Sequence, residues 1–188
     1  MYFQLGMEHI ADLGAYDHML YLLAVLATFA PHRLKPALWL ITAFTIGHSL
    51  TLALAALGWI TVNAPVIEFL IPLTIALTAA YNLWKPTAQH SNSLKVNYLL
   101  CLGFGLIHGM GFSNYLLSLL GREQDVVMPL LAFNLGLELG QIIIGICIFT
   151  LAFLARRIFN CKQRDWVLVV SGAALGLAIT MMIETKFW

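Results

Sequence analysis

Three ionisable side chains, His48, His108 and Glu138, lie inside long apolar stretches of the sequence. Ionisable groups are costly in hydrocarbon, so those that remain there ordinarily face a cavity and pair with another group. Counted at about 1.5 Å per residue from the outer ends of their segments, all three lie roughly 15 to 18 Å deep. We therefore expect them to meet at one depth inside a bundle of helices.

The neighbours of these residues support an inward orientation. Asn134, Glu138 and Gln141 follow a spacing of four and then three residues, which places them on one helical face, and Thr45 precedes His48 by three residues. Small residues four apart let helix backbones approach closely. This spacing occurs twice, in the pairs Gly105 with Gly109 and Gly136 with Gly140. Close packing of these helices would bring the polar faces together.

A second group of polar residues lies nearer the N-terminus and includes His9, Asp17 and His18. We expect it at the outer end of the first apolar segment, shallower than the first group. There it could serve as an entry site for a cation. A solvated role remains open for these residues, and Asp17 could simply cap a helix.

Imidazole and carboxylate ligands together suit divalent transition metals such as nickel, cobalt, zinc or copper, and they do not form a soft thiolate site. The candidate ligands for such an ion are His9, Asp17, His18, His48, His108 and Glu138. A single histidine in a membrane is more often a hydrogen-bonding residue than a ligand. Three ionisable groups at one depth favour a metal or proton function, with a structural polar network as the alternative.

The elements that would position these residues are membrane-spanning helices. Of the 188 residues, 61% are hydrophobic and only 10% are charged, and the mean hydropathy is +0.86. A crossing needs about 20 apolar residues. We expect one all-α domain, residues 1–188, with a short extracytoplasmic helix at its N-terminus and about six transmembrane helices. The six expected spans cover about 17–30, 37–60, 66–84, 96–120, 127–155 and 166–183.

The distribution of Lys and Arg predicts the orientation of the bundle. Eight of the ten Lys and Arg residues fall in loops on one side: Arg33, Lys35, Lys85, Lys95, Arg156, Arg157, Lys162 and Arg164. Only Arg122 and Lys186 fall on the other side. Because loops rich in Lys and Arg stay in the cytoplasm, both termini should be extracytoplasmic. The net charge of +1 gives no reason to expect nucleic acid as a partner.

Four short motifs occur in order along the chain. They are His9-Ile10 followed by Tyr16-Asp17-His18, then Phe44 to Leu52 (FTIGHSLTL), Gly105 to Phe112 (GLIHGMGF), and Phe133 to Gln141 (FNLGLELGQ). On these motifs the chain resembles the HupE/UreJ family of small bacterial membrane proteins over nearly its whole length. The resemblance implies a multi-pass protein of the bacterial cytoplasmic (inner) membrane, in a family assigned to nickel or cobalt uptake. It marks the same six metal candidates.

The preferred function is therefore a permease for a divalent transition metal, in which the outer group captures the ion and the deeper group passes it on. Two histidines and a carboxylate also describe a catalytic zinc site, so a membrane-embedded metal-dependent hydrolase is an alternative. A metal-binding accessory or sensor protein without transport is a further alternative. Besides the metal ion and the lipid bilayer, a homo-oligomer or partners in metalloenzyme maturation remain open.

Overall fold

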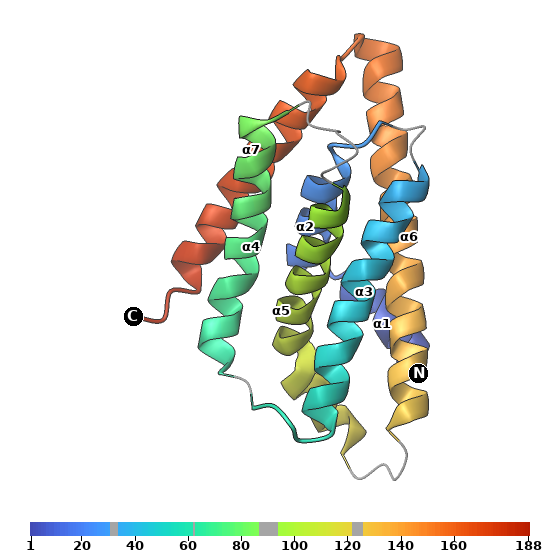
Figure 1. Ribbon diagram of the computed structural model, residues 1–188, viewed down its shortest axis with the longest axis vertical. Helices are drawn as coiled ribbons and strands as arrows, with labels where there is room; N and C mark the ends of the chain where they lie inside the picture. The colour runs from blue at the N-terminus through green and yellow to red at the C-terminus, as the bar shows by residue number, and fades with distance from the viewer. Residues whose placement is uncertain (31–33, 62, 87–93, 122–125) are drawn as a thin grey trace.

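The computed structural model describes residues 1–30, 34–61, 63–86, 94–121 and 126–188. Their regular structure is entirely helical, which confirms the predicted fold class. The helices are α1 (Tyr2–Ile10), α2 (Asp17–Leu26), α3 (Leu34–Ala56), α4 (Ala64–Trp84), α5 (Leu94–Leu120), α6 (Val127–Phe159) and α7 (Gln163–Glu184). Helices α3 to α7 run up and down the long axis of the molecule in alternation (Figure 1).

Helices α3 to α7 are the ones that are long and apolar enough to cross a membrane. Each corresponds to one of the expected spans. The interval expected between the spans 37–60 and 66–84 separates α3 from α4, with Pro65 in the first turn of α4, where its missing N–H is no loss. Helix α6 continues past its expected end to Phe159. It stops at Asn160, whose φ of 50° lies in the left-handed region. These helices make the chain a multi-pass membrane protein.

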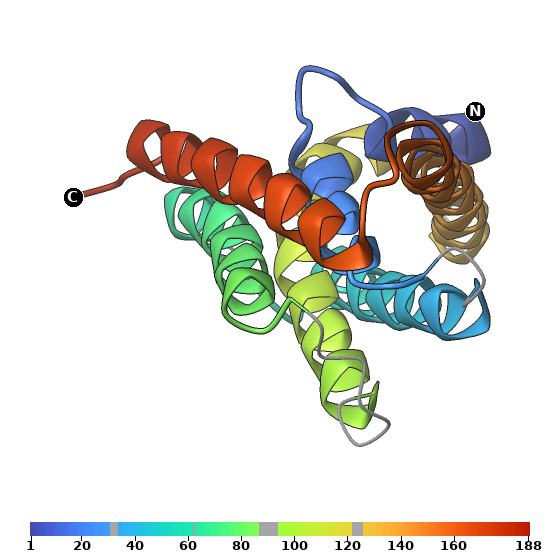
Figure 2. The same ribbon diagram turned by 90° about the horizontal axis from the view of Figure 1, so that it is seen from above.

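The first expected span differs from the observed structure. Helix α2 has ten residues, about 15 Å in length, so it cannot cross a bilayer of about 30 Å alone. Helix α1 adds nine residues, and in Figure 1 it lies in the lower half of the molecule, whereas α2 lies in the upper half. In length the two short helices together equal about one crossing. Viewed from above, α2 lies in the middle of the bundle, surrounded by longer helices (Figure 2).

Glycines allow the close helix contacts that the sequence predicted. A Cβ atom on Gly105 of α5 would overlap the backbone carbonyl of Phe44 on α3. A Cβ atom on Gly136 of α6 would likewise overlap the backbone carbonyl of Phe3 on α1. Accordingly α3 packs along α5, and α1 packs along α6. The glycine pairs therefore fix the positions of α1, α3 and α5, which carry three of the candidate histidines.

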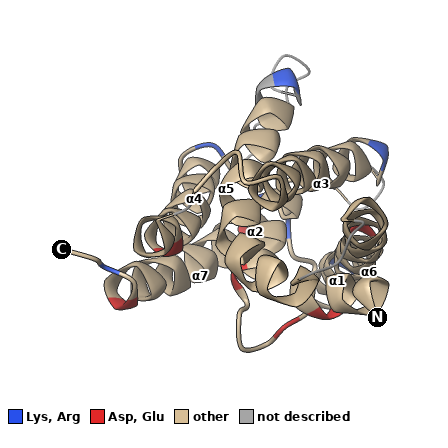
Figure 3. Cartoon of the chain, turned by 90° about the horizontal axis from the view of Figure 1, so that it is seen from below, with Lys and Arg blue, Asp and Glu red and all other residues tan. Residues whose placement is uncertain are grey.

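The two ends of the bundle differ in charge. One end, here called the basic end, carries the connections from α2 to α3, α4 to α5 and α6 to α7. The described basic residues near it are Lys35, Lys85, Lys95, Arg156, Arg157, Lys162 and Arg164; Arg33 and Arg122 lie outside the described residues. The opposite end, here called the acidic end, carries the connections from α3 to α4 and from α5 to α6. Figure 3, viewed from this end, shows acidic residues on α2, on α4 and on the connection between α1 and α2.

Candidate metal centre

Four histidines from four different helices converge in the interior: His9 of α1, His18 of α2, His48 of α3 and His108 of α5. We call them the histidine cluster. The ring centroids of His9 and His18 lie 4.7 Å apart, and those of His18 and His108 lie 4.9 Å apart. His48 lies 5.9 Å from both His9 and His18. His48 and His108 are completely buried, and His18 is 3% exposed.

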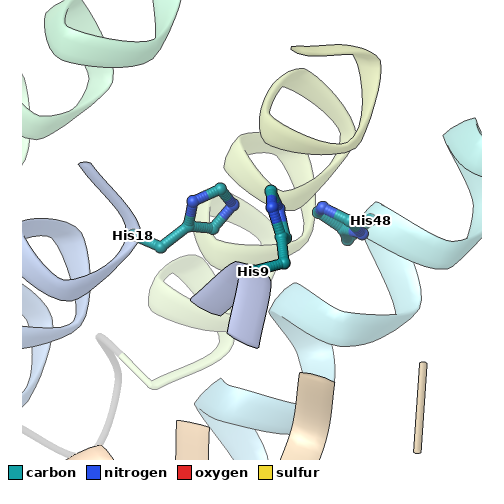
Figure 4. A group of neighbouring side chains, drawn as sticks. All are labelled: His9, His18 and His48. Atoms are coloured by element: carbon teal, nitrogen blue, oxygen red, sulfur yellow. The ribbon is translucent and has the colours of Figure 1, made fainter. Parts of the chain in front are cut away.

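Among the described residues, the histidine cluster and Asp17 form two sets of three side chains whose ligand atoms are close enough to hold a metal ion. His9, His18 and His48 form one set (Figure 4), and Asp17, His18 and His108 form the other. In each set the ligand atoms lie within 4.8 Å of one another. His18 belongs to both sets. It therefore links the two positions at which an ion could be held.

A carboxylate orients His18. The Nδ1 atom of His18 lies 2.9 Å from Oδ1 of Asp17, and the backbone amide of His18 donates a hydrogen bond to the same oxygen. Since an ionised carboxylate can only accept, Nδ1 carries the proton and Nε2 keeps its lone pair. Metal-binding histidines are commonly oriented in this way by a carboxylate or a carbonyl.

A hydroxyl orients His108 in a similar manner. Thr74 of α4 donates its hydroxyl proton to the carbonyl oxygen of Ile71 at 2.7 Å. The Thr74 oxygen can then accept from Nε2 of His108, which lies 3.2 Å away. This arrangement leaves Nδ1 of His108 with its lone pair.

Five further imidazole nitrogens are buried and have no hydrogen-bond partner among the described residues. They are Nε2 of His9, Nε2 of His18, both nitrogens of His48, and Nδ1 of His108. Leaving one buried polar group unpaired costs about 1–3 kcal/mol. Five such atoms in one small volume would be a large penalty for a purely structural network. Binding of a cation or of water molecules would remove it.

An open cavity leads to the cluster from the acidic end. We call it the vestibule; its volume is about 930 Å³, and His9, His18 and His108 are part of its wall. Four carboxylate residues also line it: Glu8, Asp12, Asp17 and Glu68. None of the described residues in its wall is Lys or Arg. A cleft lined by one sign of charge raises the local concentration of counter-ions, so the vestibule should attract cations.

The sequence predicted separate outer and deeper groups, whereas the structure brings His9, Asp17 and His18 directly against His48 and His108. The reason is the placement of α2. Helix α2 lies in the middle of the bundle (Figure 2), so its first turn places the buried His18 and the Asp17 side chain, which is 15% exposed, beside the other histidines. The exposed carboxylates of the vestibule wall are instead Glu8, Asp12 and Glu68.

Glu138, expected beside His48 and His108, belongs to neither set of ligands. Its Oε1 atom accepts a hydrogen bond from Thr42 of α3 at 2.7 Å. One turn further along α6, Gln141 accepts from Thr45 at 2.8 Å. Asn134, the third residue on this face, donates to the carbonyl of Leu130. Glu138 and Gln141 thus join α6 to α3, whereas the amide of Asn134 bonds within α6.

Sequence reasoning missed the aromatic wall of the site. The ring centroid of Phe112 lies 3.9 Å from that of His9, and Phe133 stacks on His48 with their ring centroids 6.2 Å apart. On the other side, Tyr21 and Phe44 pack against His108 at 5.3 and 5.2 Å. Aromatic residues are so frequent in apolar segments that nothing in the sequence distinguishes these from ordinary core residues. Tyr21, Phe44 and Phe133 are buried, whereas Phe112 also lines the vestibule.

Comparisons with known proteins agree with the motifs. Neither the curated proteins nor the solved structures gave a match to this chain. The model of one protein family, described as HupE / UreJ protein, matches residues 1–186. The match covers all four histidines of the cluster and all seven helices of the described chain. The chain belongs to the HupE/UreJ family.

Proposed function

We propose that this protein carries a divalent transition-metal ion, of the nickel or cobalt type, across the bacterial cytoplasmic membrane. The observation that carries the proposal is the histidine cluster, in which buried imidazole nitrogens without partners lie at the floor of an acidic cavity. Neutral imidazole is a ligand for nickel, cobalt, zinc and copper, and carboxylate oxygens add charge compensation. Membership in the HupE/UreJ family is consistent with a role in metal transport.

The proposed path begins in the vestibule. Its carboxylates attract the hydrated ion, and the ion exchanges water for imidazole at the first set, His9, His18 and His48. Because His18 belongs to both sets, the ion stays next to this imidazole when it passes from the first set to the second. Two adjacent positions of moderate affinity suit transport better than a single tight site, since an ion must leave as well as bind.

The direction follows from the charge asymmetry. Loops rich in Lys and Arg remain in the cytoplasm. We therefore assign the basic end to the cytoplasm and the acidic end, with the vestibule and both chain termini, to the extracytoplasmic side. This orientation makes the vestibule an entrance and the protein an importer.

Glu138 has a supporting role in this proposal. Its carboxylate and the amide of Gln141 hold α6 to α3 through Thr42 and Thr45. Since α3 carries His48 and α6 carries Phe133, these contacts set the positions of the groups around the cluster. Glu138 would then stabilise the site without being a ligand.

Metal accumulation in proteoliposomes tests the proposal. Protein purified with a tag that contains no histidine is reconstituted, and uptake of radioactive nickel or cobalt is compared for the parent, His48→Ala and His108→Ala. We expect both variants to lose uptake, whereas His90→Ala, which replaces none of the four histidines of the cluster, should retain it. Unaltered uptake by both cluster variants would exclude this path. Metal binding by the parent without any uptake would instead favour the accessory or sensor function.

A further inference from the structure

A second cavity lies on the other side of the histidine cluster. Its volume is about 320 Å³, and α2, α3, α4 and α5 all contribute to its wall. Thr28, Lys85 and Asn97, which line it, lie near the ends of their helices or connections at the basic end. The vestibule, by contrast, is lined by Glu8, Glu68 and other residues toward the acidic end. The two cavities therefore approach the middle of the bundle from opposite ends.

A single layer of side chains separates the cavities. His108 belongs to the wall of the vestibule and Tyr21 to the wall of the second cavity, and their ring centroids lie only 5.3 Å apart. Phe44 packs against both rings, at 5.1 Å from Tyr21 and 5.2 Å from His108. Phe104 covers the far side of Tyr21 at 5.7 Å and lines the second cavity. Tyr21 and Phe44 are each only 1% exposed, so this layer is closed.

One weak hydrogen bond fixes the polar end of this layer. The hydroxyl of Tyr21 donates to the sulfur of Cys101 on α5 at 3.4 Å, and Cys101 also lines the second cavity. A thiol is a weak acceptor, so this bond would be broken more readily than one to a carboxylate. Rotation of one side chain, Tyr21, would then expose the imidazole of His108 to the second cavity.

The second cavity offers oxygen and amide groups to a cation. Thr78, Asn82 and Asn97 line it together with Tyr21 and Cys101. Its one lysine, Lys85, lies with its Nζ atom 4.5 Å above the ring of Trp84, which partly balances its charge. Its wall also includes Leu77 and Leu100, which are about half exposed at the surface of the bundle. A lipid chain is therefore the competing occupant.

We propose that the second cavity is the exit path for the metal ion and that Tyr21 is the gate that closes it in this conformation. The proposal rests on the proposed transport function. The structure then corresponds to a state open to the acidic end and closed to the basic end. Alternating access requires such a barrier on one side of the binding site at a time.

Cys101 is a natural reporter for this gate, because it lies directly behind Tyr21. The other cysteines, Cys147 and Cys161, are replaced by alanine, so that a cationic, membrane-impermeant methanethiosulfonate reagent reacts at Cys101 alone. Sealed vesicles of both orientations are treated in the absence of metal. In the parent we expect modification from the basic side only. In Tyr21→Ala we expect modification from the acidic side to become at least about tenfold faster, since the thiol becomes accessible from the vestibule.

Further variants keep the test decisive. Tyr21→Phe retains the ring and should remain closed, while Tyr21→Leu, a milder truncation than alanine, serves if Tyr21→Ala fails to fold. His18→Ala combined with either truncation widens the vestibule, so that the size of the reagent cannot prevent its passage. If Cys101 stays unmodified from the acidic side in all truncated variants, Tyr21 is not the gate. If the parent is not modified from the basic side, the second cavity is filled by lipid and is not an exit path.

The same vesicles separate this inference from the transport function. Nickel ions added to Tyr21→Ala should slow modification from the acidic side, because a bound ion would occupy the path through the cluster. Faster modification that nickel does not affect, together with the absence of uptake, would refute metal transport but leave the barrier at Tyr21 established. If the parent takes up metal but truncation of Tyr21 does not change the rate of Cys101 modification from the acidic side, the gate alone is refuted.

Discussion

The Oδ1 atom of Asp17 lies 2.9 Å from Nδ1 of His18 and 2.8 Å from the backbone nitrogen of the same residue. Two donors of one residue thus bind one carboxylate oxygen at the first turn of α2. The imidazole of His18 is thereby held with Nε2 directed away from Asp17, and Nε2 has no hydrogen-bond partner within the described chain. Asp17 prepares His18 to bind an ion before any ion arrives.

Replacement of Asp17 by asparagine should weaken metal binding. Asparagine has the same shape, but it is neutral and its amide can donate to Nδ1, which would favour the wrong tautomer of His18. Loss of such an orienting partner typically costs 10–100-fold in metal affinity, and we expect a rise of about this size in the Kd for nickel. Calorimetric titration of the purified protein measures it.

Asp12→Asn is the matched control for this prediction. Asp12 is an exposed carboxylate in the wall of the vestibule, and its Oδ1 atom binds only the backbone amide of Gly14 among the described residues. Its removal should change the Kd by less than about threefold, as is usual for an exposed charge. Equal losses of nickel affinity in the two variants would mean that Asp17 acts through the negative electrostatic potential of the vestibule and not through His18.

His18 should be the most important residue of the cluster for binding, since both sets of ligands contain it. His18→Ala leaves neither set intact, so we expect nickel affinity to fall by more than the 10–100-fold typical of an orienting partner. His9→Ala and His108→Ala each leave one set complete, and they should bind at least about tenfold more tightly than His18→Ala does. The three Kd values are compared by the same titration. Equal losses in all three would indicate one ion bound by all four histidines.

The spans were predictable because each property that defines them is local. Apolar length predicted α3 to α7, including the interval between α3 and α4. The division of the first crossing into α1 and α2 could not be read in this way. Residues 11–16 include Asp12 and Gly14, which look like an ordinary surface connection. Residues 11–15 are exposed, as such a connection is, but the place of α2 in the middle of the bundle depends on its packing against α4, α6 and α7, which no local pattern reports.

The site was predictable in part for a similar reason. The cost of an ionisable group in an apolar segment selected His48 and His108 from the sequence, and the polar group at the start of the first apolar segment supplied His9 and His18. Depth gives only the height of a residue along its helix, however. Which neighbour it meets depends on the rotation of the helix, and α6 turns Gly136 toward α1 and Glu138 toward Thr42 of α3. Glu138 was therefore expected among the histidines but pairs elsewhere.

A comparison of Glu138→Gln with Thr42→Val tests this assignment. If Glu138 acts through Thr42, both variants should retain a nickel Kd within about threefold of the parent, because neither removes a ligand. Both should lower stability by about 1 kcal/mol, as side-chain hydrogen bonds in membrane proteins do. The double variant should cost no more than either single variant. Loss of nickel binding in Glu138→Gln alone would identify Glu138 as a ligand.

The contact between α3 and α5 gives a final prediction about the scaffold. Gly105 and Gly103 lie on the same helix, but a Cβ atom at Gly105 would overlap the Phe44 backbone, whereas one at Gly103 would have no described atom within 4 Å. Gly105→Ala should therefore force the helices apart, at a cost of about 1–3 kcal/mol. Gly103→Ala should leave stability unchanged or raise it by up to about 1 kcal/mol, because alanine favours helix.

Thermal unfolding in detergent, followed by intrinsic fluorescence, measures the difference between these two variants, with a lower Tm expected for Gly105→Ala only. Nickel binding should fall in the same variant, because His48 and His108 lie on the two helices that separate. Similar Tm values for both variants would show that α3 and α5 can adjust to an extra methyl group. The distance between the two histidines would then not depend on this glycine contact, and their nickel affinity should also be equal in the two variants.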